Sequence, residues 1–366
     1  MTAIASSRSA SPLRERGPLM LLVLLALLAA AIVLAIGSGA SWLSPGRVLA
    51  VLFDALGLDA LGLDIGPVEL RDKAVVLGIR LPRVVQGIMV GGGLALAGAL
   101  MQGLFRNPLA DPGLIGVSSG AALMAAAAIV LGGPVILFLA LPKLVLPFVL
   151  PVAAFAGGLA ATLLIHALAR RDGETEIATM LLAGVAVGAI AGAGIGYMSF
   201  LSDDRQLRDV TFWMLGSLGG ASWRSVLAMA VFMVPALLAA PLLANTLNAL
   251  ILGEREAGHL GINVERHKRL IIAVSALAVG AAVSASGIIG FVGLVVPHLV
   301  RLMLGADHRY VLPGSALLGA TLLLLCDLVA RVVVAPAELP IGVVMSALGG
   351  PFFLWMLRRR RALSMS

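Results

Sequence analysis

Two arginines that lie one helical turn apart have the type and spacing to bind carboxylates. Arg80 and Arg83 belong to the stretch RLPR, directly before a long apolar run. Residues at positions i and i+3 of a helix lie on the same side, and a guanidinium group can bind a carboxylate through two parallel hydrogen bonds. The pair therefore predicts a carboxylate-binding site at a helix end. The alternative is that both arginines only anchor that end of the helix.

A second stretch combines positive charge with aromatic and sulfur-containing side chains. Residues 203–217 read DDRQLRDVTFWMLGS, so two arginines precede an aromatic pair, Phe212 and Trp213. Such a stretch can bind an apolar ligand through soft side chains and the ligand's carboxylates through arginine. The candidate ligand-binding residues here and just before this stretch are Arg205, Arg208, Tyr197, Met198, Phe200 and Met214. The alternative is a surface loop in which neighbouring aspartates neutralise the arginines.

Residue patterns typical of hydrolytic or metal-dependent enzymes are absent from the sequence. It contains no G-x-x-x-x-G-K-[ST], H-E-x-x-H or G-x-S-x-G motif, and its five His residues form no pair with ligand spacing. The one cysteine, Cys326, lies in an apolar run, where a small packing side chain is the simpler interpretation. We therefore expect no enzyme activity, no catalytic residue, no metal site and no permanently bound cofactor.

The elements that position these residues follow from an apolar composition. The 366 residues are 60% hydrophobic and 12% charged, whereas soluble domains are about a quarter charged. Apolar runs of roughly twenty residues recur, and the alternation typical of strands is absent. Inside a bilayer each backbone polar group must be paired within the protein, and a single helix achieves this by itself. The sequence therefore predicts an all-α membrane protein.

Ten membrane-spanning helices are predicted. Their ranges are 19–36, 84–101, 114–131, 144–169, 177–201, 225–244, 270–285, 286–304, 311–335 and 339–357. The seventh and eighth are divided at the small residues 284–287. An uncleaved first helix is favoured over a signal peptide, because its apolar run is longer than the ~7–15 residues of a signal peptide. Segments 41–73 and 202–223 are expected to form short helices or loops on the external surface.

Positive charge is concentrated on one side of this topology. An even number of spans places both termini on the same side, which carries sixteen of the 26 Lys and Arg residues and nine of the 19 acids. The positive-inside rule makes that side cytoplasmic. This distribution explains the pI near 10.6 without nucleic-acid binding. We expect a cytoplasmic tail at 1–18, one membrane domain at 19–357 and a second cytoplasmic tail at 358–366.

Several longer motifs follow one another along the chain. Residues 98–120 read GALMQGLFRNPLADPGLIGVSSG between two predicted spans, and their polar residues at fixed places indicate a contact with a partner. Residues 290–298 read GFVGLVVPH, residues 338–342 read ELPIG, and residues 349–353 read GGPFF. Together with RLPR at 80–83, these motifs resemble the iron-complex and vitamin B12 importer permeases, the membrane subunits of ATP-driven uptake systems. The resemblance extends over residues 78–358.

The resemblance implies a type II importer permease that works as a homodimer in the bacterial inner membrane. Two ATP-binding cassette subunits would lie beneath the dimer, and a periplasmic substrate-binding protein would dock above it. Glutamates of the binding protein would meet the arginines at the family's docking positions: Arg80, Arg83 and Arg331. Arg331 has an alternative partner in Asp327, four residues earlier on the same predicted helix.

The longest predicted cytoplasmic loop, 245–269, contains a short segment framed by glycines. Gly253 and Gly261 can end and reorient a helix that carries three charged residues. The segment resembles the coupling loop that importer permeases insert into their ATPase subunits; an ordinary solvated loop is the alternative. The coupling residues are Leu252, Gly253, Glu254, Arg255, Glu256, Ala257, Leu260 and Gly261. ATP is expected on the separate ATPase chain, because this chain has no phosphate-binding motif.

Within the family, residues 203–217 look most like the heme-transporting members, so heme is the expected cargo. Heme is flat and apolar and carries two propionates, which Arg205 or Arg208 could bind. The cytoplasmic gate is expected at the start of the fifth span, where family members often have small polar residues. This chain departs from that pattern, and its gate candidates are Thr175, Ile177, Ala178 and Thr179.

These features together predict a permease that imports heme from periplasm to cytoplasm by alternating access at the dimer axis. Ferric siderophores and vitamin B12 are alternative cargoes for the same role. An ion-coupled secondary transporter is a further alternative, and it requires ionisable residues within the membrane as a relay. Most charges lie at span ends, with Asp327 and Arg331 as the main near-exceptions, which favours the ATP-driven importer.

Overall fold

The computed structural model describes residues 12–39, 43–57, 68–139, 142–143, 145–171 and 174–364. In this part of the chain nearly all regular structure is helical, as the composition predicts. A short hairpin was not expected: β1 (Arg170–Arg171) pairs antiparallel with β2 (Glu174–Thr175).

The long helices follow the predicted spans. They are α1 (Pro12–Gly37), α4 (Leu81–Leu104), α5 (Val117–Leu139), α6 (Leu146–Leu168), α7 (Ile177–Leu201), α9 (Trp223–Ala239), α12 (Val264–Ser286), α13 (Val292–Leu304), α14 (His308–Val332) and α15 (Ile341–Ser364). Seven helical segments of the described residues are long and apolar enough to cross a membrane. The third, eighth and tenth predicted spans coincide with shorter apolar helices.

Shorter helices connect the long ones. They are α2 (Pro45–Ala55), α3 (Leu70–Val75), α8 (Asp204–Leu215), α10 (Ala244–Leu252) and α11 (Glu254–His259), with a π-helix at Val76–Arg80 and 3-10 helices at Pro112–Ile115 and Ala240–Leu243. The predicted external segments therefore contain α2, α3 and α8. The predicted loop 245–269 is mostly helical, because α10, α11 and the start of α12 occupy it.

Some helix ends differ from the predicted ones. The chain does break near 284–287, where Gly287 ends α12 with a φ of 70°. However, α13 begins only at Val292, after Phe291 with a φ of 66°, so the connection is longer than the sequence suggests. At the chain ends, α1 begins at Pro12 and α15 continues to Ser364, so part of each predicted tail is helical.

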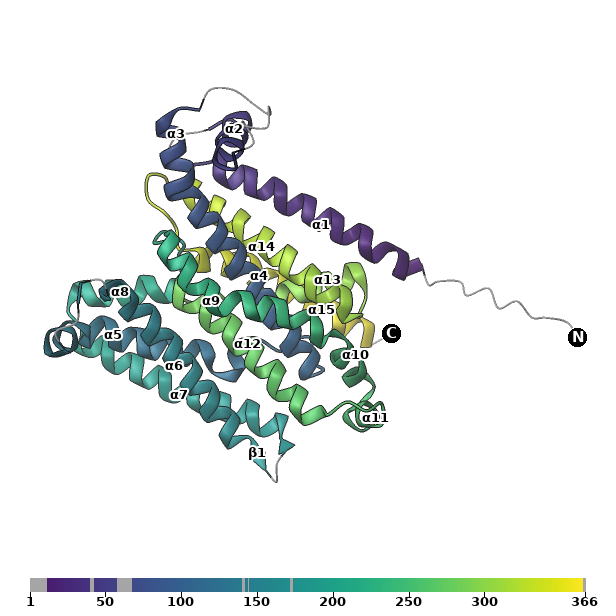
Figure 1. Ribbon diagram of the computed structural model, residues 1–366. Helices are drawn as coiled ribbons and strands as arrows, with labels where there is room; N and C mark the ends of the chain where they lie inside the picture. Colours follow the sequence, from purple (N-terminus) through teal and green to yellow (C-terminus); the bar gives the residue numbers. More distant parts are fainter. Residues whose placement is uncertain are drawn as a thin grey trace, which may run out of the picture.

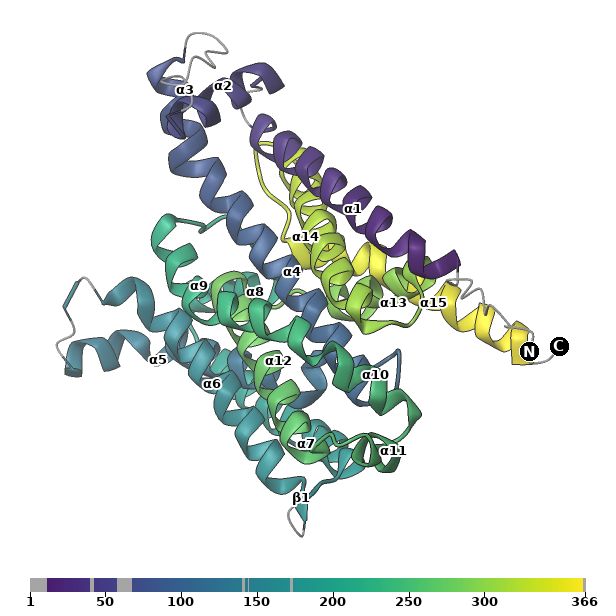
Figure 2. The same ribbon diagram turned by 45° about the vertical axis from the view of Figure 1, so that its right-hand side comes forward.

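Helix α4 is the centre of the bundle. It runs between α14 and α1 on one side and α9 and α12 on the other, while α5, α6 and α7 pack together as a neighbouring group (Figure 1 and Figure 2). Nearly every residue of α4 is buried. A Cβ on Gly91 would meet the backbone carbonyl of Gly319 in α14, and a Cβ on Gly319 would meet that of Gly91. Glycines at this crossing therefore let the two backbones approach closely.

The stretch 98–120 forms the end of α4, a turn and the start of α5. Asp111 accepts a hydrogen bond from the backbone N–H of Gly113 at 2.7 Å and thereby caps the 3-10 helix. Gly116 has a φ of 80°, and Ile115 beside it is fully buried. The turn formers of this stretch thus have a local folding role, and its contact with a partner stays a prediction.

Candidate functional site

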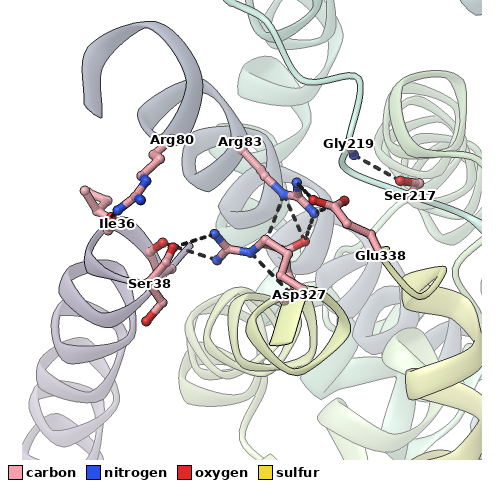
Figure 3. A network of polar contacts seen from close by, with 10 residues as sticks. Ile36, Ser38, Arg80, Arg83, Ser217, Gly219, Asp327 and Glu338 are labelled. Carbon is pink, nitrogen blue, oxygen red and sulfur yellow. Dashed lines mark hydrogen bonds and ion pairs between the residues drawn. The ribbon is translucent and has the colours of Figure 1, made fainter. Parts of the chain in front are cut away.

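Arg83, Arg331 and two carboxylates form one ionic cluster at an end of the bundle, the mouth cluster (Figure 3). Arg83 Nη2 donates to Asp327 Oδ1 and to Glu338 Oε2, both at 2.9 Å. Arg331 Nε lies 3.1 Å from the other oxygen of Asp327. Asp327 is only 1% exposed, so its charge depends on these two arginines. The predicted alternative pairing of Asp327 with Arg331 is present.

Arg80 has different partners from Arg83. Its Nη1 donates to the backbone carbonyls of Ile36 at 2.6 Å and Gly37 at 3.0 Å, at the end of α1 (Figure 3). The last carbonyls of a helix lack partners within the helix and carry partial negative charge, so they suit a cation. A π-helix ends at Arg80, and the regular α-helix begins only at Leu81. The prediction that Arg80 and Arg83 lie on the same side assumed a regular α-helix through both.

Arg331 connects the mouth cluster to the same helix end. Its Nη1 donates to the carbonyl of Ser38 at 2.9 Å, and its Nη2 donates to that of Ala35 at 3.2 Å. The structure therefore brings all three predicted docking arginines together around the end of α1. Their roles in docking stay predictions.

Glu338 is the accessible acid of the mouth cluster. Its side chain is 44% exposed, whereas that of Arg83 is 13% exposed. The hydrogen bonds from Arg83 hold the pKa of Glu338 below its ordinary value, against the opposing effect of burial. The ion pair is therefore complete at neutral pH and is lost as the pH falls through that lowered pKa. A carboxylate from outside the chain could replace Glu338 more easily than the buried Asp327.

The predicted coupling segment is a helix, α11, set at an angle by glycine. Gly253 has a φ of 126° and Gly261 a φ of 83°, conformations that L side chains rarely adopt. Ala257 is fully buried and attaches α11 to the bundle. On either side of α11, Leu252 and Leu260 are 66% and 64% exposed. Exposed leucines beside a charged helix provide a surface that a soluble partner can cover.

A buried lysine connects α11 to the predicted gate. Lys268 Nζ lies 2.7 Å from Glu254 Oε2 and donates to the carbonyl of Thr175 at 3.4 Å. Thr175 in turn donates from its hydroxyl and its backbone N–H to Glu265, at 2.5 and 3.0 Å. These groups border a polar cavity of about 520 Å³ that reaches Ile177 at the start of α7. Lys268 and Glu265 were not predicted, because their partners are distant in sequence.

The other gate candidates lie beside this contact. Thr179 donates its hydroxyl to Glu176 at 2.7 Å, so both predicted threonine hydroxyls bind glutamates. Ile177 begins α7, and Ala178 is exposed there. The gate candidates are therefore adjacent to the coupling segment, which the sequence alone did not indicate.

The candidate substrate path is mostly exposed, at the end of α7 and along α8. Tyr197, Phe200 and Met214 are exposed, whereas Met198 is half-buried and packs against α5. Asp203 accepts from the backbone N–H of Gln206 at 2.8 Å and so caps α8. Among the described residues no ion pair joins Arg205 or Arg208 to an aspartate. Both arginines are exposed and available to a carboxylate ligand.

A helical bundle with polar clusters at its ends and long apolar spans between them is typical of a membrane-spanning transport subunit. The comparison of the sequence with family models gives the same class. The chain belongs to the FecCD transport family, whose model matches residues 27–359. The predicted membership of the iron-complex and vitamin B12 importer permeases is thereby confirmed.

Relatives with assigned names are similar over most of the chain. The hemin transport system permease protein HmuU of Yersinia pestis is 49% identical over 285 residues, which are 78% of this chain and 83% of that protein. The vitamin B12 import system permease protein BtuC of Escherichia coli is 40% identical over 341 residues, 93% of this chain and 95% of that protein. These relatives are transport permeases and not enzymes.

A solved structure is also similar. It is described as an inward-facing conformation of a metal-chelate type ABC transporter. It aligns with a TM-score of 0.79 and 30% sequence identity, over 93% of this chain and 99% of that one. Sequence and structure comparisons therefore agree on a multi-pass permease of the inner membrane.

Replacing Asp327 by Asn should lower the unfolding temperature of the purified protein. The change leaves Arg83 and Arg331 buried without their shared counter-charge, and losing one partner of a buried ion pair costs about 3 kcal/mol. Glu338→Gln is the matched control, since an exposed ion pair contributes about 1 kcal/mol or less. Thermal unfolding in detergent measures both variants. Equal losses for the two would contradict a dominant role for the buried carboxylate.

Proposed function

We propose that this chain is the permease subunit of an ATP-driven importer that carries heme from the periplasm to the cytoplasm. The observation that supports heme most directly is the 49% identity to a hemin permease over 78% of the chain. The arginines of α8, which are exposed and form no ion pair with a described residue, support the same cargo, because heme presents two carboxylates. No iron-ligating residue is required, since a transport path must release its cargo.

The proposed subunit has ten spans with both termini in the cytoplasm and follows the type II architecture. Residues 1–18 and 358–366 form its cytoplasmic tails, and 19–357 its membrane domain. It works with a second copy of itself, two ATP-binding cassette subunits and a periplasmic binding protein. ATP binds to the cassette subunits. The excess of positive charge on the side of the termini supports this orientation.

The second copy would pack beside α7. Met180 and Ala191 are the only buried residues of this helix within the described chain, although its neighbours α5 and α6 are more deeply packed. Large apolar side chains such as Leu182 and Ile190 are exposed along it. Part of this surface would face lipid, and part would face the copy across a shared path. The path would take heme past Tyr197 and Phe200, with the propionates at Arg205 or Arg208.

Docking of the loaded binding protein would occur at the mouth cluster. A glutamate of the binding protein would replace Glu338 on Arg83, while Asp327 continues to hold Arg83 and Arg331 in place. Exchange of one carboxylate for another costs little, because the guanidinium keeps its hydrogen bonds throughout. Arg80 and Arg331 would then position the end of α1 and contribute positive potential to the docking surface.

Movement of the ATPase subunits would reach the path through α11. Leu252 and Leu260 would enter a cleft of the ATPase, and Glu254 would pull on Lys268. Because Lys268 also holds the carbonyl of Thr175, the start of α7 would move with α11. Two conformations with different affinity for the ATP-bound cassette dimer supply the bias for alternating access.

Vesicles containing the permease, its ATPase and its binding protein should accumulate heme only when ATP is supplied. ADP and an ATPase variant unable to hydrolyse ATP are the controls, and heme absorbance inside the vesicles is the measurement. ATP hydrolysis stimulated by a ferric siderophore or a corrinoid, with no heme accumulation, would reassign the cargo within the family. Uptake driven by an ion gradient without the ATPase would instead support a secondary transporter.

Arg83→Gln and Glu338→Gln should change docking of the loaded binding protein in opposite directions. Arg83→Gln removes the docking group and should weaken binding about tenfold, the scale of one charge-assisted contact of ~1.4 kcal/mol. Glu338→Gln removes the internal competitor and should strengthen binding. Surface plasmon resonance on the immobilised complex measures both. Weakening by both variants would show that the cluster only maintains the shape of the mouth.

Gly253→Leu and Gly261→Leu should uncouple ATP hydrolysis from heme uptake. A leucine is strained at these positive φ angles by roughly 1–3 kcal/mol, so α11 should leave its orientation. Gly258→Leu is the control, because Gly258 lies in α11 without a positive φ and with no atom within 4 Å of where a Cβ would lie. The measurement is heme transported per ATP hydrolysed. An unchanged ratio in the two φ-strained variants would remove α11 from the coupling mechanism.

A further inference from the structure

A large apolar groove lies beside α12. It has a volume of about 770 Å³ and lies between the first halves of α6 and α9, with the end of α12 as its floor. Both α6 and α9 pack against α12, and the rings of Phe155 and Phe232 bridge them with centroids 4.4 Å apart. The groove is therefore a gap between two helices that is closed at the bottom by a third.

The groove opens toward the lipid side of the bundle. Val152 on α6 is exposed at its edge, and Leu227 and Val231 are exposed on α9 beside it. Both helices belong to segments long and apolar enough to cross a membrane. A surface of this composition faces hydrocarbon and not water. The occupant must therefore be able to enter from the bilayer.

The interior of the groove offers few free polar groups. Ser225 donates to Gln86 at 3.1 Å, and Gln86 donates to the carbonyl of Ala285 at 3.0 Å. Ser284 donates to the carbonyl of Ala281 at 3.0 Å. The remaining lining is mainly aromatic and aliphatic, with Phe148, Phe155 and Phe232 prominent. Such a cavity excludes ordered water and favours an alkyl chain.

A positive charge lies at the mouth of the groove. Arg224 is the second residue of α9, exposed, and it forms no ion pair or hydrogen bond within the described chain. It lies at the bundle end where α6 and α9 begin, the level at which lipid headgroups meet the protein. Trp223 beside it also lines the groove and donates its indole N–H to the carbonyl of Leu77 at 2.8 Å. Tryptophan and arginine at this level are typical of headgroup contacts.

We propose that this groove is a phospholipid-binding site, in which an acyl chain lies over Phe155 and Phe232 and the phosphate binds Arg224. The apolar length of the groove and the single cation at its mouth match the two ends of a phospholipid. A protein segment is a poorer match, because the lining leaves few partners for its backbone polar groups. The bound lipid would fill the gap between α6 and α9 and hold both helices against α12. This site is independent of the identity of the transported cargo.

Photo-crosslinking with a lipid of known structure tests the site directly. The full-length permease is reconstituted with phosphatidylglycerol that carries a diazirine on one acyl chain, and labelled peptides are identified by mass spectrometry. Ala156→Trp fills the groove, and Ala160→Trp adds the same ring one helical turn away on the exposed surface of α6, outside the groove lining. Ala228→Phe fills the groove from α9 as a second variant.

The groove peptides of α6 and α9 should be labelled in the unaltered protein and in Ala160→Trp. Labelling should fall at least fivefold in Ala156→Trp and Ala228→Phe, with lipid labelling of α7 unchanged as a measure of correct folding. Arg224→Gln should reduce labelling about fivefold, the size expected for one basic side chain near an anionic headgroup, and Arg224→Lys should restore most of it. Diacylglycerol with the same chains should label as weakly in the unaltered protein as phosphatidylglycerol does in Arg224→Gln.

Three results would overturn the proposal. Equal groove labelling in Ala156→Trp and Ala160→Trp would show that the lipid lies on the surface and not in the groove. Equal labelling by diacylglycerol and phosphatidylglycerol would remove the phosphate contact. Crosslinks between two copies through groove residues would make the groove a protein interface. A failure of heme transport would affect none of these outcomes.

Discussion

At the break between α12 and α13, the end of α12 and Pro297 within α13 leave backbone carbonyls inside the bundle without a helical N–H partner, and α4 supplies the side chains that bind them. Gln86 donates to the carbonyl of Ala285 before the break at 3.0 Å. Gln102 donates to the carbonyls of Gly293 and Leu294 after it, at 3.2 and 3.1 Å, and the carbonyl of Gly293 has no i+4 donor because residue 297 is proline. Leaving one such polar group without a hydrogen bond at this depth would cost several kcal/mol, about as much as in hydrocarbon. Helix α4 therefore stabilises the broken pair of helices through Gln86 and Gln102.

The same break organises the surface at the mouth. The backbone N–H of Ser217 donates to the carbonyl of Ser286 at 2.8 Å, and that of Ile341 donates to Gly216 at 3.0 Å. A Cβ on Gly287 would meet the carbonyl of Trp213, so the end of α8 lies directly on the break. The candidate path on α8 and the first residue of α15 are thus both held by backbone contacts that begin at the end of α12.

Buried charged side chains, like the buried backbone groups, have partners within the bundle. Asp327 is buried between Arg83 and Arg331, which are themselves half-buried, and Arg80 is buried against the carbonyls that end α1. At the opposite end of the bundle, Lys268 is 5% exposed and is held by Glu254 and Thr175. Each of these clusters lies at a helix end, so together they do not form a relay of ionisable residues through the membrane. Their location agrees with a permease whose energy enters from a partner protein.

The sequence predicted features that depend on residues close together in the chain, such as helices and glycine turns. Contacts between residues far apart in the chain became visible only in the structure. Apolar periods predicted the helices, and Gly253 and Gly261 predicted a short reoriented α11, because glycine conformation is a local property. The spacing of Arg80 and Arg83 predicted carboxylate binding for both; Arg83 binds Asp327 and Glu338, whereas Nη1 of Arg80 binds the carbonyls of Ile36 and Gly37. Arg80 and Arg83 have different partners because a π-helix ends at Arg80 and the carbonyls at the end of α1 lie beside it. Neither feature is recognisable from a sequence motif.

Helix α12 connects the two ends at which the proposed transport steps occur. Its first turns carry Glu265 and Lys268, which hold the hairpin and α11, and its last residue, Ser286, holds the loop after α8. The helix is continuous over its 23 residues and mostly buried, so it can transmit a displacement as one rigid element. In the proposed mechanism, an ATPase that moves α11 therefore acts on the gate through Lys268 and on the path through the far end of the same helix. The groove beside α12 lies where a bound lipid would limit how far that helix can move away from α6 and α9.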